Sequence, residues 1–410
     1  MKRLLYITVT APLGLAESFI IQEMNCLVRS GIELTIVPLR PAGRVFHQDG
    51  TTLLPFTLVT GLWSIRVWLA ALIWLVKAPR RVMGLLLMLL RRGSLKNRLR
   101  NLLVFPKSLF IAEQVRLLKV EHIHAHWAST PSTCAMVASC LTGVDWSFTA
   151  HRWDIQNNNL LAEKTANCSF ARAISSHGHM RLLMAAGPGR GDKVTLVPMG
   201  VEVPEILTAS AVPYEMGKTV MVAAVGSLTP VKGHRHLVRA CQLLARCGVD
   251  FRCLIIGEGP ERKALSKMID ELKLWDRVIL AGAIPNQRVL KILGSGAINL
   301  LVHPSVETPD GEHEGVPVVV MEAMARGVPV IATHSGGLPE IVNEMTGMLI
   351  PPGNPSALAR AVKEVLDNPE AARLKLLSAR CLVEEKFNLE NNVSLLLDKM
   401  RDCRPGRLRG

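Results

Sequence analysis

The sequence predicts an α/β protein with doubly wound domains, and three observations lead to this prediction. The chain has 410 residues, enough for about two to three domains with separate cores. Hydrophobic residues make up 49% of the chain, a fraction that excludes an intrinsically disordered protein. Residues 4–38 read as apolar strand, glycine-containing loop, helix and second strand, which is the opening of a doubly wound domain.

The other elements follow from apolar runs that glycine, proline and polar turns separate. We expect strands at 4–10, 32–38, 120–127, from 146 into a loop at 151–154, 170–176, 194–199, 219–226, 251–257, 278–282, 297–303, 329–333 and 348–351. We expect helices ending near Gly31 and Leu272, and helices at 317–327, from Pro339, 356–366, 371–386 and 389–401. A segment rich in small residues, 205–218, reads as a linker because it separates two series of strands.

The most informative stretch is 310–340, DGEHEGVPVVVMEAMARGVPVIATHSGGLPE. Glu314 and Glu322 lie eight positions apart, so one falls in a loop and the other about one turn inside the next helix. Pro317 suits the start of that helix and Gly327 its end. A helix start binds phosphate well, whereas carboxylates there suit the hydroxyls of a sugar or ribose. This stretch therefore predicts a site for a nucleotide sugar.

The E-x7-E spacing inside EGVPVVVMEAMARGVPVIAT, with SGGLPE after it, resembles the retaining glycosyltransferases of family four. Within them the chain looks most like the bacterial exopolysaccharide enzymes of the colanic acid and amylovoran type. The resemblance implies the GT-B fold, with two facing Rossmann-like domains and a deep inter-domain cleft. It divides the chain into an acceptor-side domain 1–204, the linker 205–218, a nucleotide-sugar-binding domain 219–386, and a terminal helix 387–410 that returns to the first domain.

The implied activity is a hexosyltransferase reaction that moves a sugar from a UDP- or GDP-sugar to an acceptor hydroxyl with retained configuration. It needs no metal or other cofactor. By resemblance, Glu322 binds the ribose, Glu314 the sugar, and Lys232 the donor diphosphate. The expected catalytic residues are His151, Glu314 and Lys232. The expected substrate-binding residues are Gly14, Glu17, Asp154, Gly257, Glu258, Gly315, Val316, Pro317, Val318 and Glu322.

One position departs from the family pattern. The loop SLTPVKGH, 227–234, places Ser227 where relatives have an arginine that neutralises the diphosphate. Arg235, Arg152 or His234 would have to substitute, or donor binding is weakened. Two alternatives therefore stay open: a nucleotide-sugar epimerase of the same fold, and a catalytically weak scaffold for polysaccharide assembly at a membrane.

Histidines and cysteines do not predict a metal site or a disulfide framework. His122, His124 and His126 alternate and would share one face of a strand. No further ligand pattern follows them, so we favour bonds to substrate or backbone over metal binding. The nine cysteines contain no CxxC pair, which fits buried thiols in a reducing cytoplasm.

A basic, apolar insertion at about 57–119 interrupts the first domain. Its segment 77–119 holds eleven basic residues and one acid, Glu113, and the chain as a whole carries a net charge of +14. The apolar runs 67–76 and 82–90 are too short to span a bilayer. Trp63, Trp68 and Trp74 flank or interrupt the first run. We expect docking on an anionic membrane surface on the cytoplasmic side, near a lipid-linked saccharide acceptor. The alternatives are two helices packed on the domain and, least favoured, nucleic-acid binding.

Overall fold

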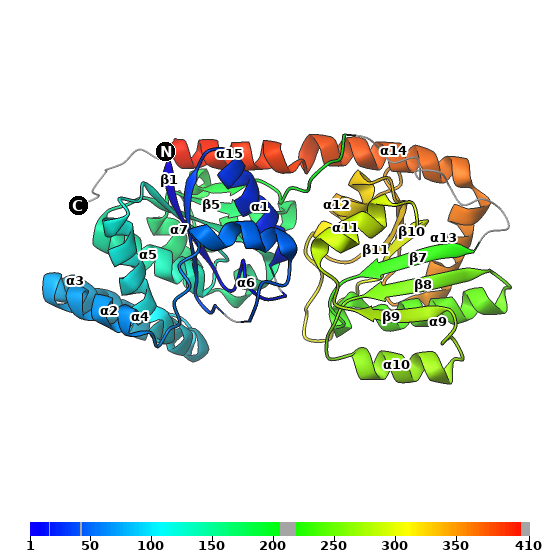
Figure 1. Ribbon diagram of the computed structural model, residues 1–410, viewed down its shortest axis with the longest axis horizontal. Helices are drawn as coiled ribbons and strands as arrows, with labels where there is room; N and C mark the ends of the chain where they lie inside the picture. The colour runs from blue at the N-terminus through cyan, green and yellow to red at the C-terminus, as the bar shows by residue number, and fades with distance from the viewer. Residues whose placement is uncertain (16, 42, 206–218, 403–410) are drawn as a thin grey trace. The chain divides into compact units, whose positions relative to one another are not determined.

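The computed structural model describes residues 1–15, 17–41, 43–205 and 219–402. The predicted linker lies, after Glu205, outside the described residues. The chain divides into two compact units, which we treat separately (Figure 1). Unit 1 contains Met1–Met199 and the C-terminal residues from Glu390, and unit 2 contains Gly200–Leu389.

Unit 1 is built on a parallel six-stranded sheet with the order β2-β1-β3-β4-β5-β6. Its strands are β1 Arg3–Thr8, β2 Glu33–Pro38, β3 His122–His126, β4 Trp146–Ala150, β5 Phe170–Ala173 and β6 Val194–Leu196. Leu4, Leu5, Tyr6 and Ile7 of β1 are all fully buried, because helices cover both faces of a parallel sheet. Such strands read as continuous apolar runs, which is why the sequence predicts them.

The helices of unit 1 include the predicted insertion as three consecutive α-helices. Its helical segments are α1 Ser18–Arg29, η1 Gln48–Phe56, α2 Ile65–Lys77, α3 Pro79–Arg91, α4 Leu95–Leu117, α5 Thr130–Thr142, α6 Arg152–Asn157, α7 Leu161–Asn167, α8 Ser176–Ala186, η2 Gly191–Lys193 and, from Glu390, α15 Leu389–Arg401. Helix α4 packs against both α5 and α2, so it joins the insertion to the domain core. Among the described helices, none has the combined length and hydrophobicity needed to cross a bilayer.

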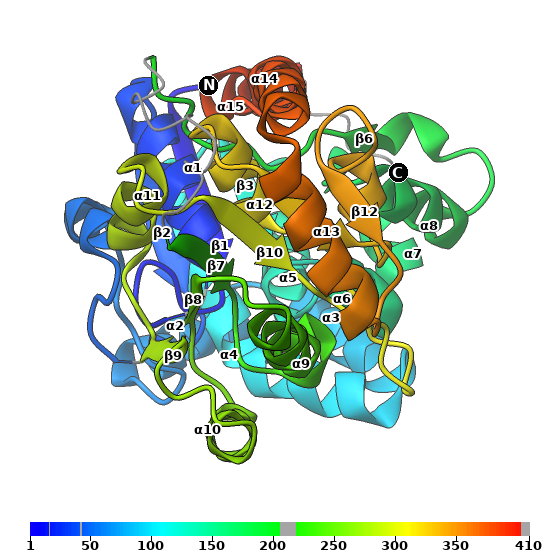
Figure 2. The same cartoon turned by 90° about the vertical axis from the view of Figure 1, so that its right-hand side faces the viewer.

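Unit 2 is built on a second parallel sheet, with the order β12-β11-β10-β7-β8-β9. Its strands are β7 Val220–Val225, β8 Phe251–Ile256, β9 Val278–Gly282, β10 Leu300–His303, β11 Val330–Thr333 and β12 Met348–Ile350. Its helical segments are η3 Pro230–Lys232, α9 His234–Arg246, α10 Arg262–Glu271, α11 Asn286–Gly294, α12 Val318–Ala325, η4 Leu338–Glu340, α13 Pro355–Asp367 and α14 Pro369–Lys386. Helices α9 and α13 lie side by side (Figure 2), and α12 packs against α11 and α14.

The predicted α/β class is correct, and one predicted helix is not. The helix expected from Pro339 is only the short 3₁₀ segment η4. The chain has no room for more, because Asn343 and Thr346 form a turn through reciprocal backbone and side-chain hydrogen bonds. It then enters β12 at Met348.

Strand order locates the edge of each sheet where a ligand is expected. In doubly wound sheets, ligands bind at the carboxyl ends of the strands where the order reverses. This point lies between β1 and β3 in unit 1 and between β7 and β10 in unit 2. The loops 9–17 and 127–129 therefore frame one candidate site, and the loops 226–234 and 304–317 frame the other.

Candidate functional site

The loop after β7 holds Lys232 at the carboxyl edge of the unit 2 sheet. Gly233 follows it with a φ of 63°, and a Cβ there would lie 2.0 Å from the carbonyl oxygen of Pro304. The two loops are also joined by the backbone N–H of Val306, which donates to the oxygen of Val231 over 2.9 Å. Only glycine permits this approach. Lys232 is therefore seated directly beside the loop that leads to Glu314.

Glu314 is the centre of a compact polar cluster. Its Oε2 accepts from Lys232 Nζ at 2.5 Å and Ser305 Oγ at 3.2 Å, and lies 3.2 Å from His303 Nε2. Its Oε1 accepts from the backbone N–H of Gly315. Burial alone would raise the pKa of Glu314, but the Lys232 ammonium and the His303 contact hold that pKa well below its usual value. Glu314 is thus an ionised acceptor paired with a cation.

The glycine turn of the SGGLPE motif packs against the backbone of the loop that carries Glu314. Gly336 has a φ of 56°, and a Cβ there would lie 1.8 Å from the carbonyl oxygen of Glu314. The backbone N–H of Gly337 donates to the carbonyl oxygen of Gly315 over 3.2 Å. The motif therefore has a structural reason: two glycines let the turn pass directly against the carboxylate-bearing loop.

The predicted phosphate-binding residues lie at the start of α12. The sequence predicts Pro317 as the first residue of the helix. In the structure Pro317 is the N-cap residue, and the helix begins at Val318. The first backbone amides of a helix have no partner inside it. Those of Val318 and Val319 are therefore oriented to bind an anion, together with the positive end of the helix dipole.

Glu322 and Glu258 lie in different surroundings from Glu314. Glu322, one turn inside α12, is buried and accepts from Asn286 Nδ2 at 3.1 Å. Glu258 is exposed and pairs with Arg262 at 2.7 Å. Gly257 before it has an extended, glycine-type backbone, and a Cβ there would lie 1.9 Å from the carbonyl oxygen of Gly226. In this structure Gly257 lets the loops after β7 and β8 pack together.

Two of the three proposed substitutes for the missing arginine can be judged within unit 2. Arg235 pairs with Glu261 at 2.5 Å. His234 is buried, and burial lowers its pKa to about 4, so it supplies no charge near neutrality. Ser227 shares a hydrogen bond with Thr229 between their hydroxyl groups. Of the predicted diphosphate ligands in unit 2, Lys232 is thus the one that lies in the polar cluster around Glu314. Arg152 belongs to unit 1.

In unit 1, Glu17 organises the loop after β1. Its carboxylate accepts from the backbone N–H groups of Val9, Thr10 and Ala11, from the Thr10 hydroxyl, and from the indole N–H of Trp127. Its side chain makes no capping hydrogen bond to α1, although Glu17 is the N-cap residue of that helix. Gly14 lies in the same loop with a φ of 82°, and its backbone N–H donates to the carbonyl oxygen of Arg44 over 3.1 Å.

His151 and Asp154 form the first turn of α6 at the carboxyl end of β4. They make a capping box, in which the Asp154 Oδ1 accepts from the backbone N–H of His151 over 2.7 Å. Asp154 also accepts from the backbone N–H of Ala128, and it is fully buried. Burial raises the pKa of Asp154 to about 7, against the opposing effect of these bonds. Asp154 therefore joins the loop after β3 to the loop after β4. His151 is half-buried beside the Trp127 ring, with ring centres 4.3 Å apart.

The three alternating histidines are buried, and their partners are side chains of neighbouring elements. His122 and His124 contact the Ser147 hydroxyl at 2.7 and 2.8 Å, and His124 also contacts Thr149. His126 contacts Tyr6 and His151. The partners that the structure shows for these rings are thus side chains rather than the expected backbone groups. The sequence showed their shared face but carried no sign that polar residues of β4 would meet them.

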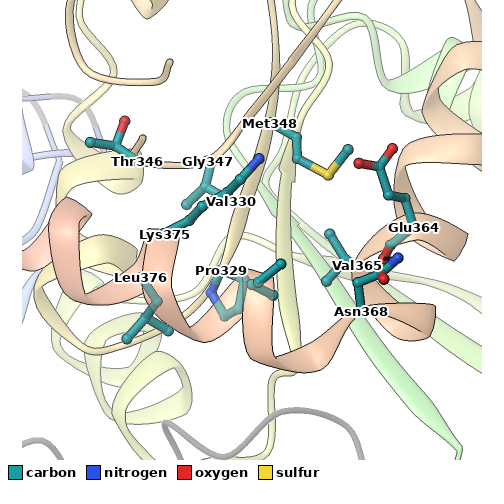
Figure 3. Close-up of a pocket in the computed structure, with 12 residues that line it drawn as sticks. Pro329, Val330, Thr346, Gly347, Met348, Glu364, Val365, Asn368, Lys375 and Leu376 are labelled. Carbon is teal, nitrogen blue, oxygen red and sulfur yellow. Dashed lines mark hydrogen bonds between the residues drawn. The ribbon is translucent and has the colours of Figure 1, made fainter. Parts of the chain in front are cut away.

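A small pocket in unit 2 lies at the other end of the sheet (Figure 3). It is lined by Pro329 and Val330 at the start of β11, Gly347 and Met348 at the start of β12, and side chains of α13 and α14 such as Glu364 and Lys375. Because it opens at the amino ends of the strands, it is separate from the cluster around Glu314. We do not assign it to the nucleotide sugar.

The structure thus brings together Lys232 and Glu314 in unit 2, and Glu17, Asp154 and His151 around Trp127 and Ala128 in unit 1. Sequence reasoning missed His303 and Ser305, the partners of Glu314, and Trp127, the partner of Glu17. A usable signal existed for the first two, since they end β10 next to the motif. Trp127 gave no comparable signal, because its link to Glu17 spans 110 positions.

Comparison with known proteins supports a glycosyltransferase relationship. Residues 210–376 match the family model described as glycosyl transferases group 1. The Escherichia coli protein WcaL, named as a colanic acid biosynthesis glycosyltransferase, is 37% identical over 204 residues, 48% of each chain. The amylovoran biosynthesis glycosyltransferase AmsK of Erwinia amylovora is 33% identical over 198 residues, again 48% of each chain. The chain spans about half the length of the curated relatives it matches.

Solved structures extend the comparison of the fold to nearly the whole chain. Anabaena HepE in complex with UDP-glucose has a TM-score of 0.70 and 15% identity, covering 98% of this chain and 100% of its own. A glycosyltransferase from Rickettsia africae has a TM-score of 0.69 and 18% identity, covering 98% of both chains. The GT-B fold class is therefore confirmed. The predicted resemblance to colanic acid and amylovoran glycosyltransferases is confirmed as well, over the half of the chain that these relatives cover.

Proposed function

We propose that the protein is a retaining glycosyltransferase of bacterial exopolysaccharide or surface polysaccharide biosynthesis. It moves a sugar from a UDP- or GDP-sugar to a lipid-linked saccharide, without a metal. The observation that carries this proposal is the Lys232–Glu314 pair at the switch point of unit 2, next to the start of α12. It combines a cation for a diphosphate with a carboxylate for sugar hydroxyls.

Two kinds of relatives support the donor and the pathway. Structures of the same fold have been solved with UDP and with UDP-glucose. The relatives WcaL and AmsK are named for colanic acid and amylovoran biosynthesis. The E-x7-E stretch offers two carboxylates, Glu314 and Glu322, for the hydroxyl groups of a sugar donor.

The reaction follows from these groups. The donor diphosphate displaces Glu314 from Lys232 and takes the first amides of α12, so Glu314 becomes available to sugar hydroxyls and Glu322 to the ribose. The bond between the anomeric carbon and the diphosphate oxygen breaks, and the acceptor oxygen attacks on the same face. The acceptor proton passes to the departing diphosphate, so no protein base is required. Lys232 and the helix start stabilise the charge that develops on the leaving group.

Nucleotide binding tests the donor site. Calorimetric titration with UDP and with GDP should show binding of one of them, and Lys232→Ala and Glu322→Ala should each weaken it by about 10- to 100-fold, since each loses a charge-assisted contact of about 1.5–3 kcal/mol. Lys267→Ala is the matched control, because this exposed lysine lies on α10 of the same unit and pairs with the exposed Glu271. Equal weakening in the control, or no binding of either nucleotide, would contradict the proposal.

Membrane docking forms part of the proposal and rests on the surface of the insertion. Val67, Ala70, Ala71 and Trp74 of α2 are buried in the unit 1 core. The same helix and its neighbours leave large apolar side chains exposed, among them Trp63 at 75%. Most of the basic residues of 77–119 are exposed as well, so an anionic bilayer on the cytoplasmic side would complement both the apolar side chains and the charge.

A catalytically weak scaffold is the second candidate, and Ser227 is the observation that favours it. The loop that holds Lys232 offers a hydroxyl pair, Ser227 and Thr229, where relatives have a second cation. Nucleotide binding without transfer to a lipid-linked saccharide would select this candidate. Restoring the cation with Ser227→Arg should then raise nucleotide affinity.

A further inference from the structure

A chain of hydrogen bonds runs through the core of unit 1 and ends on His151. Arg172 Nη1 donates to Glu23 Oε2 at 2.6 Å, and the Tyr6 hydroxyl donates to Glu23 Oε1 at 2.6 Å. Tyr6 Oη lies 2.7 Å from His126 Nδ1, and His126 Nε2 lies 2.8 Å from His151 Nε2. All members except His151 are fully or almost fully buried, so protein groups alone determine where the protons are.

The direction of each bond follows from the first member. Glu23 is ionised, because the Arg172 guanidinium outweighs the effect of burial and lowers its pKa. An ionised carboxylate only accepts, so the single hydroxyl proton of Tyr6 points to Glu23. The Tyr6 oxygen must then accept from its other neighbour, and His126 carries its proton on Nδ1.

The same logic passes to His151. Burial keeps the pKa of His126 well below its usual value, so this ring has one proton and a bare Nε2. His151 Nε2 must therefore donate to it, which leaves Nδ1 of His151 bare. The capping box of α6 agrees independently, because it places the backbone N–H of Asp154 against the His151 side chain, where a bare nitrogen is required.

We infer that Tyr6, Glu23 and His126 are positioning residues that hold His151 in the neutral form with its proton on Nε2. Resting on the proposed function, this makes His151 a fixed, uncharged ring beside the acceptor-side loops rather than a proton donor or acceptor for the reaction. It fits a transfer in which the departing diphosphate takes the acceptor proton.

A metal ion is the competing explanation for this cluster. Glu23, His124 and His126 have one ligand atom each within 4.8 Å of one another. However, both oxygens of Glu23 and both ring nitrogens of each histidine already contact a protein partner. A metal would have to break this chain, so the hydrogen-bond reading accounts for more of the contacts.

The decisive variant is Glu23→Gln, which keeps the shape and reverses the chain. Arg172 has only donors, so the new amide would turn its oxygen to Arg172 and its NH2 to Tyr6. Tyr6 would then donate to His126 Nδ1, and the His126 proton would move to Nε2. His151 could then no longer keep its proton on Nε2. A proton on Nδ1 instead would oppose the backbone N–H of Asp154, which needs an acceptor on this ring. A merely structural role for Glu23 predicts no such reversal.

Nitrogen NMR of the full chain labelled with ¹⁵N-histidine measures these tautomers without substrate. Signals are assigned with His126→Gln and His151→Gln. We expect protonated Nδ1 in His126 and protonated Nε2 in His151, reversal at His126 in Glu23→Gln, and mixed tautomers in the milder Tyr6→Phe. Thr149→Val is the control, because it removes an equally buried hydroxyl that contacts His124 outside the chain. Added Zn²⁺ should leave the signals unchanged.

Protonated Nε2 in wild-type His126, wild-type tautomers in both Glu23→Gln and Tyr6→Phe, or displacement of the signals by Zn²⁺ would overturn the inference. If Glu23→Gln does not fold, Tyr6→Phe decides. In the transfer assay, Tyr6→Phe should lower kcat by up to about 100-fold with little change in the KM for the donor, since the ring is misplaced and the nucleotide site in unit 2 is not touched. If the wild type transfers no sugar, the proposed function fails while the tautomer result stands by itself.

Discussion

At the scale of single residues, three glutamates at the candidate sites differ in what their carboxylates bind. Glu314 binds a lysine and two polar side chains, Glu322 contacts an asparagine on α11, and Glu17 binds backbone amides and an indole. The chemistry of a carboxylate is therefore decided by its donors. Glu314, whose main donor is a lysine side chain, can exchange that partner for a ligand, whereas Glu17 is held by its loop.

Glu17→Gln should destabilise unit 1 by about 1–3 kcal/mol. Every described partner of Glu17 is a donor, so the NH2 of glutamine must face at least one N–H or O–H group. Denaturant unfolding followed by tryptophan fluorescence measures this loss. Glu121→Gln is the control, since Glu121 is exposed and its ion pairs contribute little. Equal stability of Glu17→Gln and wild type would show that the loop does not depend on this carboxylate.

The sequence predicted site residues that belong to a motif. It did not predict side-chain contacts between residues that only the fold brings together. The pairing of Lys232 with Glu314 joins positions 82 apart, and Arg172 with Glu23 joins positions 149 apart. Spacing along the chain says nothing about such contacts. The same is true of Asp154, which accepts from the backbone N–H of Ala128, 26 positions earlier in the chain.

At the scale of elements, the α2–α4 insertion combines a packed face with an exposed apolar face. The Trp63 and Trp68 rings stack on one another at 6.2 Å, and both are exposed. One face of the insertion therefore packs on the core of unit 1, as the packing alternative predicts. The other face is exposed and apolar, so membrane docking stays a prediction.

Trp63→Ser with Trp68→Ser should reduce binding to phosphatidylglycerol vesicles by about tenfold or more, because apolar burial drives interfacial binding. Binding should also fall as salt is raised, and neutral phosphatidylcholine vesicles should bind less. Co-sedimentation measures all three effects. Trp275→Ser is the matched control, since this tryptophan is 72% exposed but lies in unit 2. Unchanged binding in the double variant would refute docking through this face.

Lys107 links the segment at the start of the insertion to helix α4. It is fully buried on α4, and its Nζ donates to the carbonyl oxygen of Thr60 at 2.5 Å. Burial lowers the pKa of Lys107 to about 8, whereas an unfolded lysine titrates near 10.5. Between these values the unfolded chain binds more protons, so the free energy of unfolding should rise with pH, by at most about 1.4 kcal/mol per pH unit.

Urea unfolding at several pH values from 7.5 to about 10 tests this with Lys107→Met, which lacks the titration. Wild type should gain stability relative to the variant across the interval. Lys96→Met, an exposed position on the same helix, should follow the wild-type curve. A constant difference between wild type and Lys107→Met would mean that the lysine keeps its ordinary pKa.

At the scale of the whole molecule, the strands of the two sheets could be predicted from the sequence pattern. The addition of the C-terminal helix α15 to unit 1 could be predicted only from the family resemblance. Apolar runs such as Leu4–Ile7 and Val220–Val225 identify strands because helices cover both faces of each sheet. Strand order, however, depends on which crossovers the chain makes, and no local pattern encodes it. The membership of α15 in unit 1 likewise has no local sign, since its sequence differs little from that of any amphipathic helix.

Leu396→Asp should lower the stability of unit 1 by several kcal/mol, because Leu396 of α15 is fully buried. Leu395→Asp, one position earlier and 54% exposed, is the control. Unfolding curves should separate the two variants, while nucleotide affinity, which we propose to depend on unit 2, should be equal in both at temperatures where the protein is folded. Identical unfolding of the two variants would contradict the placement of α15.

The split composition of unit 1 also sets the order in which the protein is made. A ribosome delivers residues 1–199 first, then all of unit 2, and only afterwards the helix that unit 1 lacks. Domains usually fold in the order of their synthesis. Here unit 2 has its full set of residues before unit 1 does, so the first-made part of unit 1 lacks α15, with its buried Leu396 and Met400, until that helix has been made.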